Sequence, residues 1–152
     1  MNSHPENTEQ LFEMAGLSGD ACILDMGAGD GNSGCSVMID IAPRSESVIQ
    51  ADMLALPFED GMFDGVLSQC AFYASGDPHR AMDEAMRVLK PGGKLMLSDV
   101  FFEEPWFDYD ACVDLTAQWR EYYLRSLWSD EPCPPLPKGE TPPKYYLIVR
   151  SK

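Results

Sequence analysis

The 152 residues suffice for one domain spanning residues 1–152, and 45% hydrophobic with 24% charged residues is an ordinary globular composition. Twenty-five acidic against 11 basic residues give a net charge of −14, and the absence of a basic cluster argues against a nucleic-acid partner. Five cysteines without a CxxC pair, together with two histidines, predict neither a disulfide framework nor a metal site.

The N-terminal residues 1–10 lack the basic start and the apolar run of a signal peptide. No stretch of the sequence approaches the length and apolarity of a membrane span. We therefore expect no membrane association and a location in the reducing cytoplasm.

Three segments predict helices. Residues 7–15 place apolar side chains on one face, and Gly16 can end that helix. The second helix starts at Asp77 and Pro78, because Asp is a good N-cap and Pro is favoured at the first helical position. Residues 109–127 predict a long third helix. Beyond it, six of the 12 prolines lie between positions 132 and 143, which predicts an irregular loop.

Short apolar runs that end in acidic or small polar residues recur along the chain. Runs of this kind predict buried strands, and strands separated by helical segments predict a mostly parallel sheet. The fold class is therefore α/β, with a Rossmann-like sheet of about six strands and an antiparallel last strand. The predicted strands are residues 22–24, 36–39, 48–51, 63–68, 94–100 and 145–149.

The first two crossovers between strands are short. Only residues 27–35 connect strands 1 and 2, and only about residues 41–46 connect strands 2 and 3. Parallel crossovers with a helix usually take about ten or more residues. We therefore expect both helices to be absent or reduced to a turn, with one sheet face thinly covered. Such a face would favour a homodimer or a protein partner.

A glycine-rich segment, Asp25-Met-Gly-Ala-Gly-Asp-Gly31, follows the first predicted strand. Glycines there let the backbone turn tightly and approach a ligand closely. Residues 29–34 also fit the GxGxxG dinucleotide fingerprint. That fingerprint expects an acid about 20 residues further on, whereas Asp40 follows Gly34 after only six positions. A nicotinamide or flavin oxidoreductase is therefore the less favoured interpretation.

Aspartates stand at the ends of the first three predicted strands, at positions 25, 40 and 52. Ligands of parallel sheets bind outside the carboxyl ends of the strands. Asp40 is placed to accept both hydroxyls of a ribose, and Asp52 to accept an adenine amino group. Solvated loop acids are the simpler alternative for each residue taken alone.

The sequence resembles the class I S-adenosylmethionine-dependent methyltransferases of the ubiquinone/menaquinone-biosynthesis type. The matching segments are ILDMGAGDG, VMIDIAP, QADMLALPFEDGMFDGVLSQ and HRAMDEAMRVLKPGGKLMLSDV, between about residues 23 and 100. The resemblance implies S-adenosylmethionine as the cofactor and methyl transfer to a small-molecule acceptor. The alternative is a catalytically reduced S-adenosylmethionine-binding or interaction module, which the short crossovers favour.

The resemblance also implies a cofactor site. Its residues would be Asp25 (amino group), Gly27, Ala28 and Gly29 (homocysteine and ribose), Asp40 (ribose hydroxyls), Ile41 (adenine ring), Asp52 and Met53 (adenine edge), Ser68 and Gln69 (amino-acid end) and Tyr73 (reaction centre). Alignment of donor and acceptor supplies most of the acceleration in such a displacement, so no catalytic residue is assigned. Residues 101–143 would form an aromatic acceptor side.

Overall fold

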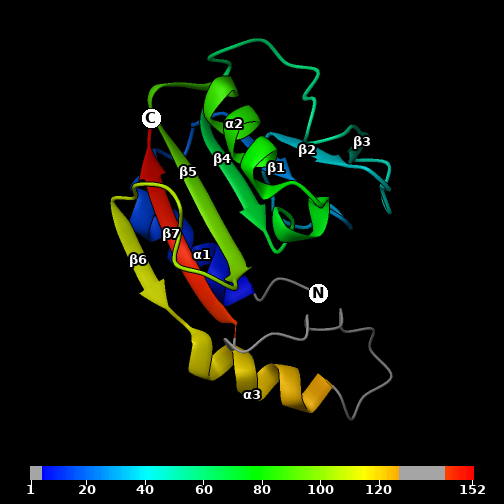
Figure 1. The fold of residues 1–152 in the computed structure, drawn as a ribbon. Coiled ribbons are helices and arrows are strands. Elements are labelled where there is room, and N and C mark those ends of the chain that lie inside the picture. The colour runs from blue at the N-terminus through cyan, green and yellow to red at the C-terminus, as the bar shows by residue number, and fades with distance from the viewer. Residues whose placement is uncertain (1–4, 127–142) are drawn as a thin grey trace.

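The computed structural model of the protein describes residues 5–126 and 143–152 (Figure 1). The helices are α1 (Pro5–Ala15), α2 (Pro78–Val88) and α3 (Thr116–Ser126), with a short 3-10 helix η1 (Tyr73–Ser75). The strands are β1 (Ile23–Met26), β2 (Val37–Asp40), β3 (Ile49–Gln50), β4 (Phe63–Gln69), β5 (Leu89–Phe101), β6 (Ala111–Asp114) and β7 (Lys144–Ser151).

The strands form one sheet in the order β3-β2-β1-β4-β5-β7-β6. The first five pair in parallel, whereas β7 runs antiparallel to both β5 and β6. This confirms the predicted Rossmann-like α/β fold with an antiparallel last strand. The described residues contain seven strands, one more than the sequence indicated.

The additional strand is β6, and it corrects the prediction of one long helix over residues 109–127. Cys112 and Trp119 lie at helical spacing, but residues 111–114 pair instead with β7, opposite Tyr146–Val149. Cys112 packs into the core on one face of the sheet and Val113 into the core on the other. The helix begins only at Thr116, whose N–H donates to the carboxylate of Asp114.

A proline-rich loop was predicted between positions 132 and 143. Its residues up to 142 lie outside the described part of the chain.

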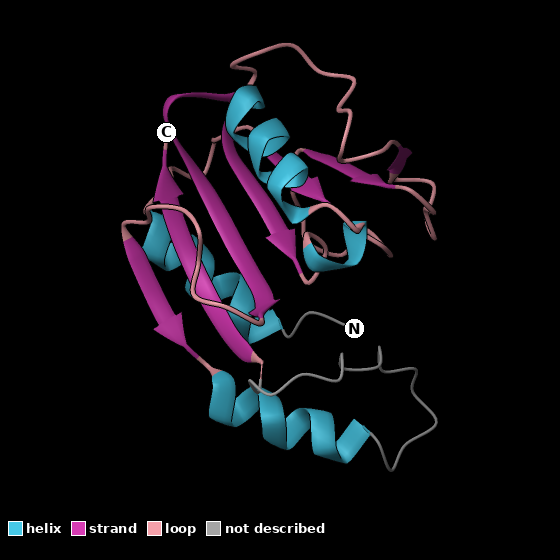
Figure 2. Ribbon diagram, in the orientation of Figure 1, coloured by secondary structure: helices cyan, strands magenta, loops and turns pink. Residues whose placement is uncertain are grey.

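Helices cover both faces of the sheet centre, as Figure 2 shows, with α2 on one face and α1 on the other. Successive residues of the central strands alternate between the two cores. Val66 of β4 and Leu95 of β5 pack with α2, while Leu67 and Met96 pack with α1. The near-continuous apolar runs of these strands follow from this burial on both faces.

The sheet edge formed by β2 and β3 has no helix in either crossover, as the short connections predicted. Residues 27–36 and 41–48 form only turns and bends. Figure 1 shows this edge extending beyond the layer that α2 covers. Ile49 of β3 is 54% exposed as a result. The predicted thin cover over this edge is therefore present in the structure.

The connection between β3 and β4 is tied to α2 by a buried carboxylate. Glu84 accepts from the N–H of Leu56 at 2.8 Å and from the guanidinium of Arg87 at 2.9 Å. Arg87 donates further to the carbonyl oxygens of Phe58 and Leu56. Side chains of α2 thus hold an irregular segment that has few main-chain bonds of its own.

The predicted N-cap of α2 is also present, since Asp77 accepts from Arg80 N–H at 3.0 Å.

Candidate functional site

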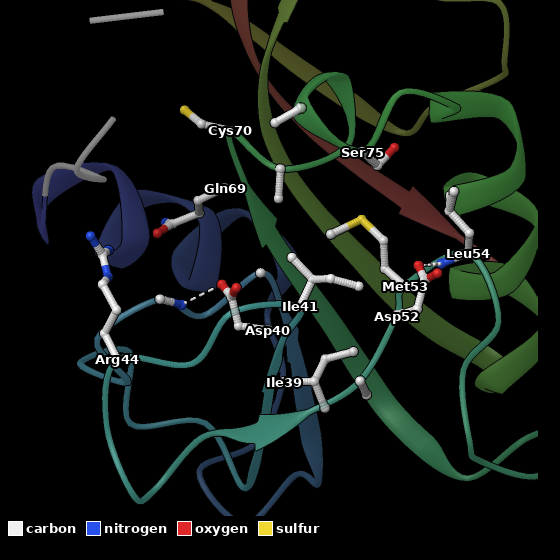
Figure 3. Close-up of a pocket in the computed structure, with 15 residues that line it drawn as sticks. Ile39, Asp40, Ile41, Arg44, Asp52, Met53, Leu54, Gln69, Cys70 and Ser75 are labelled. Carbon is white, nitrogen blue, oxygen red and sulfur yellow. Dashed lines mark hydrogen bonds between the residues drawn. The ribbon is translucent and has the colours of Figure 1, made fainter. Parts of the chain in front are cut away.

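A cavity of about 350 Å³ opens at the carboxyl ends of β1, β2 and β4. We call it the glycine-loop cavity. Its walls come from the β1–β2 loop, the segments after β2 and β3, and the β4–η1 segment. Figure 3 shows Arg44 and Gln69 at one end and Met53 and Leu54 at the other, with Asp40 between them.

The glycine loop, residues 27–31, lies against β2 on one side and against the segment after β4 on the other. The N–H groups of Gly27 and Ala28 both donate to the carbonyl of Ile39 at 2.9 Å. Gly27 has φ +86°, and a Cβ there would stand 2.5 Å from the Cβ of Ala71. Glycine is therefore required at this position by conformation and by space. The close approach leaves main chain, rather than side chains, facing the cavity.

Two aspartates from successive strand ends border the cavity. Asp40 accepts from the N–H groups of Gly29 and Ala42, both at 2.9 Å. Asp52 accepts from Leu54 N–H at 2.9 Å, and Figure 3 draws this bond together with that from Gly29 to Asp40. An ionised carboxylate offers about four acceptor positions, so each side chain retains acceptors for a ligand.

The opposite wall contains a residue in an unusual backbone conformation. Cys70 has φ +56°, a left-handed value that costs a non-glycine residue about 1 kcal/mol or more. Its N–H donates to Ser98 O at 2.7 Å, and its thiol lies 3.6 Å from the hydroxyl of Tyr145. Burial, with the charge of Asp99 second, raises the pKa of the Cys70 thiol to about 12. It is therefore a neutral wall residue rather than a thiolate nucleophile.

Seven of the eleven predicted site residues line this cavity. They are Gly27, Gly29, Asp40, Ile41, Asp52, Met53 and Gln69. The other four, Asp25, Ala28, Ser68 and Tyr73, are not among the described residues that line it. Ser68 is fully buried within β4, and Tyr73 borders a different cavity on the far side of η1.

Asp25 lies buried in the second half of β1, directly before the glycine loop in the chain. Burial raises the pKa of its carboxyl to about 6, a hydrogen bond from Ser33 lowers it, and the charge of Asp40 raises it. The three aspartates therefore do not share one surface: Asp40 and Asp52 line the cavity, whereas Asp25 is buried and is not among the described residues that line it.

Arg44 was not predicted from the sequence, although it lines the cavity. Its N–H donates to Gly29 O, its guanidinium pairs with Asp30 at 3.0 Å, and a Cβ on Gly29 would meet that guanidinium at 2.7 Å. Arg44 lies in an irregular crossover, where the sequence has no repeating pattern from which its position could be predicted. The shortness of this crossover could have indicated the position, because a short connection forces residues 41–48 to fold back over the glycine loop.

Residues 24–97 match the family model described as "Methyltransferase domain". This segment contains the glycine loop, both cavity aspartates, and β4 with α2. The match covers just under half of the chain. Residues 24–97 are therefore similar in sequence to methyltransferase domains.

Two of the curated proteins that are similar to this chain act on different kinds of molecule by their names. An arsenite methyltransferase from Aquipseudomonas alcaligenes is 27% identical over 78% of this chain and 47% of its own length. The ubiquinone/menaquinone biosynthesis C-methyltransferase UbiE from Roseobacter denitrificans is 32% identical over 61% of this chain and 43% of its own. The chain thus spans less than half the length of these relatives.

Among solved structures, a geranyl diphosphate C-methyltransferase from Streptomyces coelicolor A3(2), determined with S-adenosyl-L-homocysteine, superposes with a TM-score of 0.72. The identity is 17%, and the alignment covers 96% of this chain and 78% of that one. At this identity the likeness establishes the fold alone. Within the described residues, no helix has the length and apolarity needed to cross a bilayer.

Proposed function

We propose that the chain is an S-adenosylmethionine-dependent methyltransferase acting on a small-molecule acceptor, with the cofactor in the glycine-loop cavity. One observation carries the proposal. Two carboxylates from successive strand ends, Asp40 and Asp52, border the same cavity as the main chain of Gly27 and Gly29. A scaffold without a ligand has no need of this combination.

The cavity fits an adenosyl group in size and in chemistry. Its volume of about 350 Å³ lies in the range of small-ligand sites, which is about 300–1,000 Å³. Ile41, Met53 and Leu54 supply apolar contact for a flat base. Asp40 would hold the ribose hydroxyls and Asp52 the adenine edge. Gly27 lines the cavity without a side chain, since a Cβ there would press into Ala71. A ligand can therefore approach the main chain of the loop closely.

The bound cofactor supplies a methyl group activated by its sulfonium. The residues of this chain would bind and orient the cofactor. Asp40 would accept hydrogen bonds from the ribose hydroxyls, and the apolar wall would exclude water from the adenine base. Orientation and desolvation account for most of the acceleration in an in-line displacement. Two of the relatives are named for arsenite and naphtoquinone methylation, so we propose the acceptor only as a small molecule.

Two further proposals accompany the first. We infer a reducing, cytoplasmic location, which the free thiols of Cys22, Cys35, Cys70 and Cys112 support. We also infer that a second copy or a protein partner covers the thin edge, where Ile49 is exposed. The alternative function, a reduced cofactor-binding module, keeps the same cavity but transfers no methyl group.

Calorimetric titration with S-adenosylhomocysteine tests the site. We expect Asp40→Ala to weaken binding by about tenfold or more, because it removes a charged acceptor for two hydroxyls. Asp83→Ala is the matched control, since Asp83 is exposed on α2 and does not line the cavity. Unchanged affinity in Asp40→Ala would remove the ribose assignment.

Transfer of a labelled methyl group from S-adenosylmethionine to small-molecule acceptors separates the two functions. The methyltransferase proposal expects product from the wild type and a loss in Asp40→Ala at limiting cofactor. Tight S-adenosylhomocysteine binding without product from an acceptor panel of quinols, amines and arsenite would favour the binding module.

A further inference from the structure

A second cavity, of about 240 Å³, lies on the other side of η1 from the glycine-loop cavity. We call it the aromatic cavity. Its walls come from the start of η1 and α2, the end of β5, and the β5–β6 connection. That connection, residues 102–110, contains no helix, so the sheet face beside α2 remains open there.

The two cavities have no lining residue in common. Ala71, Ala74 and Ser75 face the glycine-loop cavity, whereas Phe72 and Tyr73 face the aromatic cavity. The same short turn is thus a wall of both. The turn therefore lies between the two cavities, which are distinct from each other.

Aromatic rings form the mouth of this cavity. Trp106 is 43% exposed and Tyr73 is 42% exposed. Trp106 lies 4.3 Å from the ring of His79, and Tyr73 lies 5.0 Å from the ring of Phe102, measured between centroids. Two ring pairs with exposed faces, at the rim of an apolar cavity, are suited to a ligand with a flat apolar body.

The charges around the cavity are acidic. Asp99, Glu103 and Glu104 line it, while neither lysine nor arginine does so among the described residues. Glu104 pairs with Lys144 at 2.5 Å. Asp99 is buried, and its carboxylate accepts from main-chain N–H groups, among them those of Tyr73 at 3.2 Å and Val100 at 2.8 Å. Within the described part of the chain, no lysine or arginine lines the cavity beside this carboxylate.

The N-terminus of α2 also borders the cavity and would favour an anion. Its partial positive charge is met by Asp77, which accepts from Arg80 N–H. The carboxylates of Asp99 and Glu103 therefore decide the sign of the favoured ligand. Aromatic faces add to this preference, because the ring quadrupole attracts cations.

We propose that the aromatic cavity is a second ligand site, for a small organic cation with an apolar or aromatic body, such as an arylalkyl ammonium. The cation would lie against the carboxylates of Asp99 and Glu103, and the apolar body between the rings of Trp106 and Tyr73. This site does not depend on the proposed methyltransferase activity.

Three probes of similar shape and different charge test the proposal at pH 7.5: phenethylamine, 2-phenylethanol and phenylacetate. Ligand-observed NMR on the whole chain, with and without S-adenosylhomocysteine, measures their affinities. We expect phenethylamine to bind at least about tenfold more tightly than phenylacetate, with 2-phenylethanol between them. Equal affinities, tighter phenylacetate, or loss of phenethylamine by competition with S-adenosylhomocysteine would each overturn the proposal.

Variants locate the binding. Trp106→Ala should weaken phenethylamine binding by about fivefold or more, and Glu103→Gln should reduce the preference for the cation. Tyr109→Ala is the matched control, because Tyr109 is 45% exposed in the same connection and does not line the cavity. Because all three side chains are exposed, we expect the variants to fold as the wild type does. The midpoint of thermal unfolding of each variant checks this expectation. Equal effects of Trp106→Ala and Tyr109→Ala would overturn the assignment, whatever the outcome for the methyltransferase.

Discussion

The centre and the β2–β3 edge of the sheet are built by different means. In the centre, β4 and β5 are covered by α2 on one face and α1 on the other, and their side chains pack into two cores. At the edge, turns replace the helices, and the structure depends on main-chain bonds such as those from Gly27 and Ala28 to Ile39. The glycine-loop cavity, where we propose that the cofactor binds, therefore lies mostly in the part of the fold with the least packing behind it.

The largest difference between centre and edge is expected for loss of an apolar side chain. Phe63 of β4 is 1% exposed and packs edge-on against Phe58, whereas Ile49 of β3 is 54% exposed. Phe63→Ala should lower the free energy of unfolding by about 3–5 kcal/mol. Ile49→Ala should change it by about 0.5 kcal/mol or less. Urea unfolding measures both, and a comparable loss in Ile49→Ala would show that a partner or a second copy packs on the edge.

The next largest difference between the centre and the β2–β3 edge is expected for the loss of stability when an ion pair is removed. Glu84→Ala would leave Leu56 N–H and the guanidinium of Arg87 without their buried acceptor, at a cost of about 2–4 kcal/mol. Asp30→Ala at the edge removes an exposed pair with Arg44 and should cost less than about 0.5 kcal/mol. Urea unfolding of the two variants is again the measurement. A small effect of Glu84→Ala would mean that α2 does not hold the β3–β4 connection.

The sequence predicted the centre of the sheet better than the opposite edge, formed by β6, for a physical reason. Burial on both faces produces apolar runs, and Asp77 with Pro78 marks the start of α2 directly. The same approach failed for residues 111–114, because four residues of a strand beside a helix carry no distinguishable period. Only the pairing with β7 decides their conformation.

Some of the residues that line the glycine-loop cavity could also be predicted from the sequence. Strand ends indicated Asp40 and Asp52, and glycine spacing indicated the loop. Neither signal shows where a side chain points, and Asp25 is buried rather than among the residues that line the cavity. Arg44 and Cys70 line the cavity through an irregular crossover and a left-handed backbone. These features arise from tertiary contacts, which no local pattern records.

Glycine substitutions sharpen the comparison within the β1–β2 loop itself. Gly27 and Gly34 both have positive φ, but a Cβ meets Ala71 at 2.5 Å in the first case and nothing within 4 Å in the second. Gly34→Ala should cost about 1 kcal/mol from backbone strain alone. Gly27→Ala should cost about 2 kcal/mol or more, because the clash adds to the strain. Only Gly27→Ala should also weaken S-adenosylhomocysteine binding, and equal unfolding and binding data for the two variants would contradict the close approach.

The smallest expected effect is a dependence of stability on pH that arises from the buried strand-end acids. Burial raises the pKa of Asp25 and of Asp99 to about 6, from an ordinary value of 3.8. A carboxyl with a raised pKa binds its proton more tightly in the folded state, so stability increases as the pH falls. Between pH 7 and pH 5 each group should add roughly 1 kcal/mol to the free energy of unfolding.

Substitution separates these two carboxyls from other sources of pH dependence. Asp25→Asn should remove about half of the increase, because Asp99 in β5 still titrates. Asp20→Asn is the control, since a hydrogen bond from Ser18 lowers the pKa of exposed Asp20 below 3.8 and keeps it ionised throughout this range. Urea unfolding at pH 5 and pH 7 gives the comparison. A stability that falls from pH 7 to pH 5, or an unchanged slope in Asp25→Asn, would mean that the carboxyl of Asp25 is hydrated, and that the loose packing of the β2–β3 edge extends to β1.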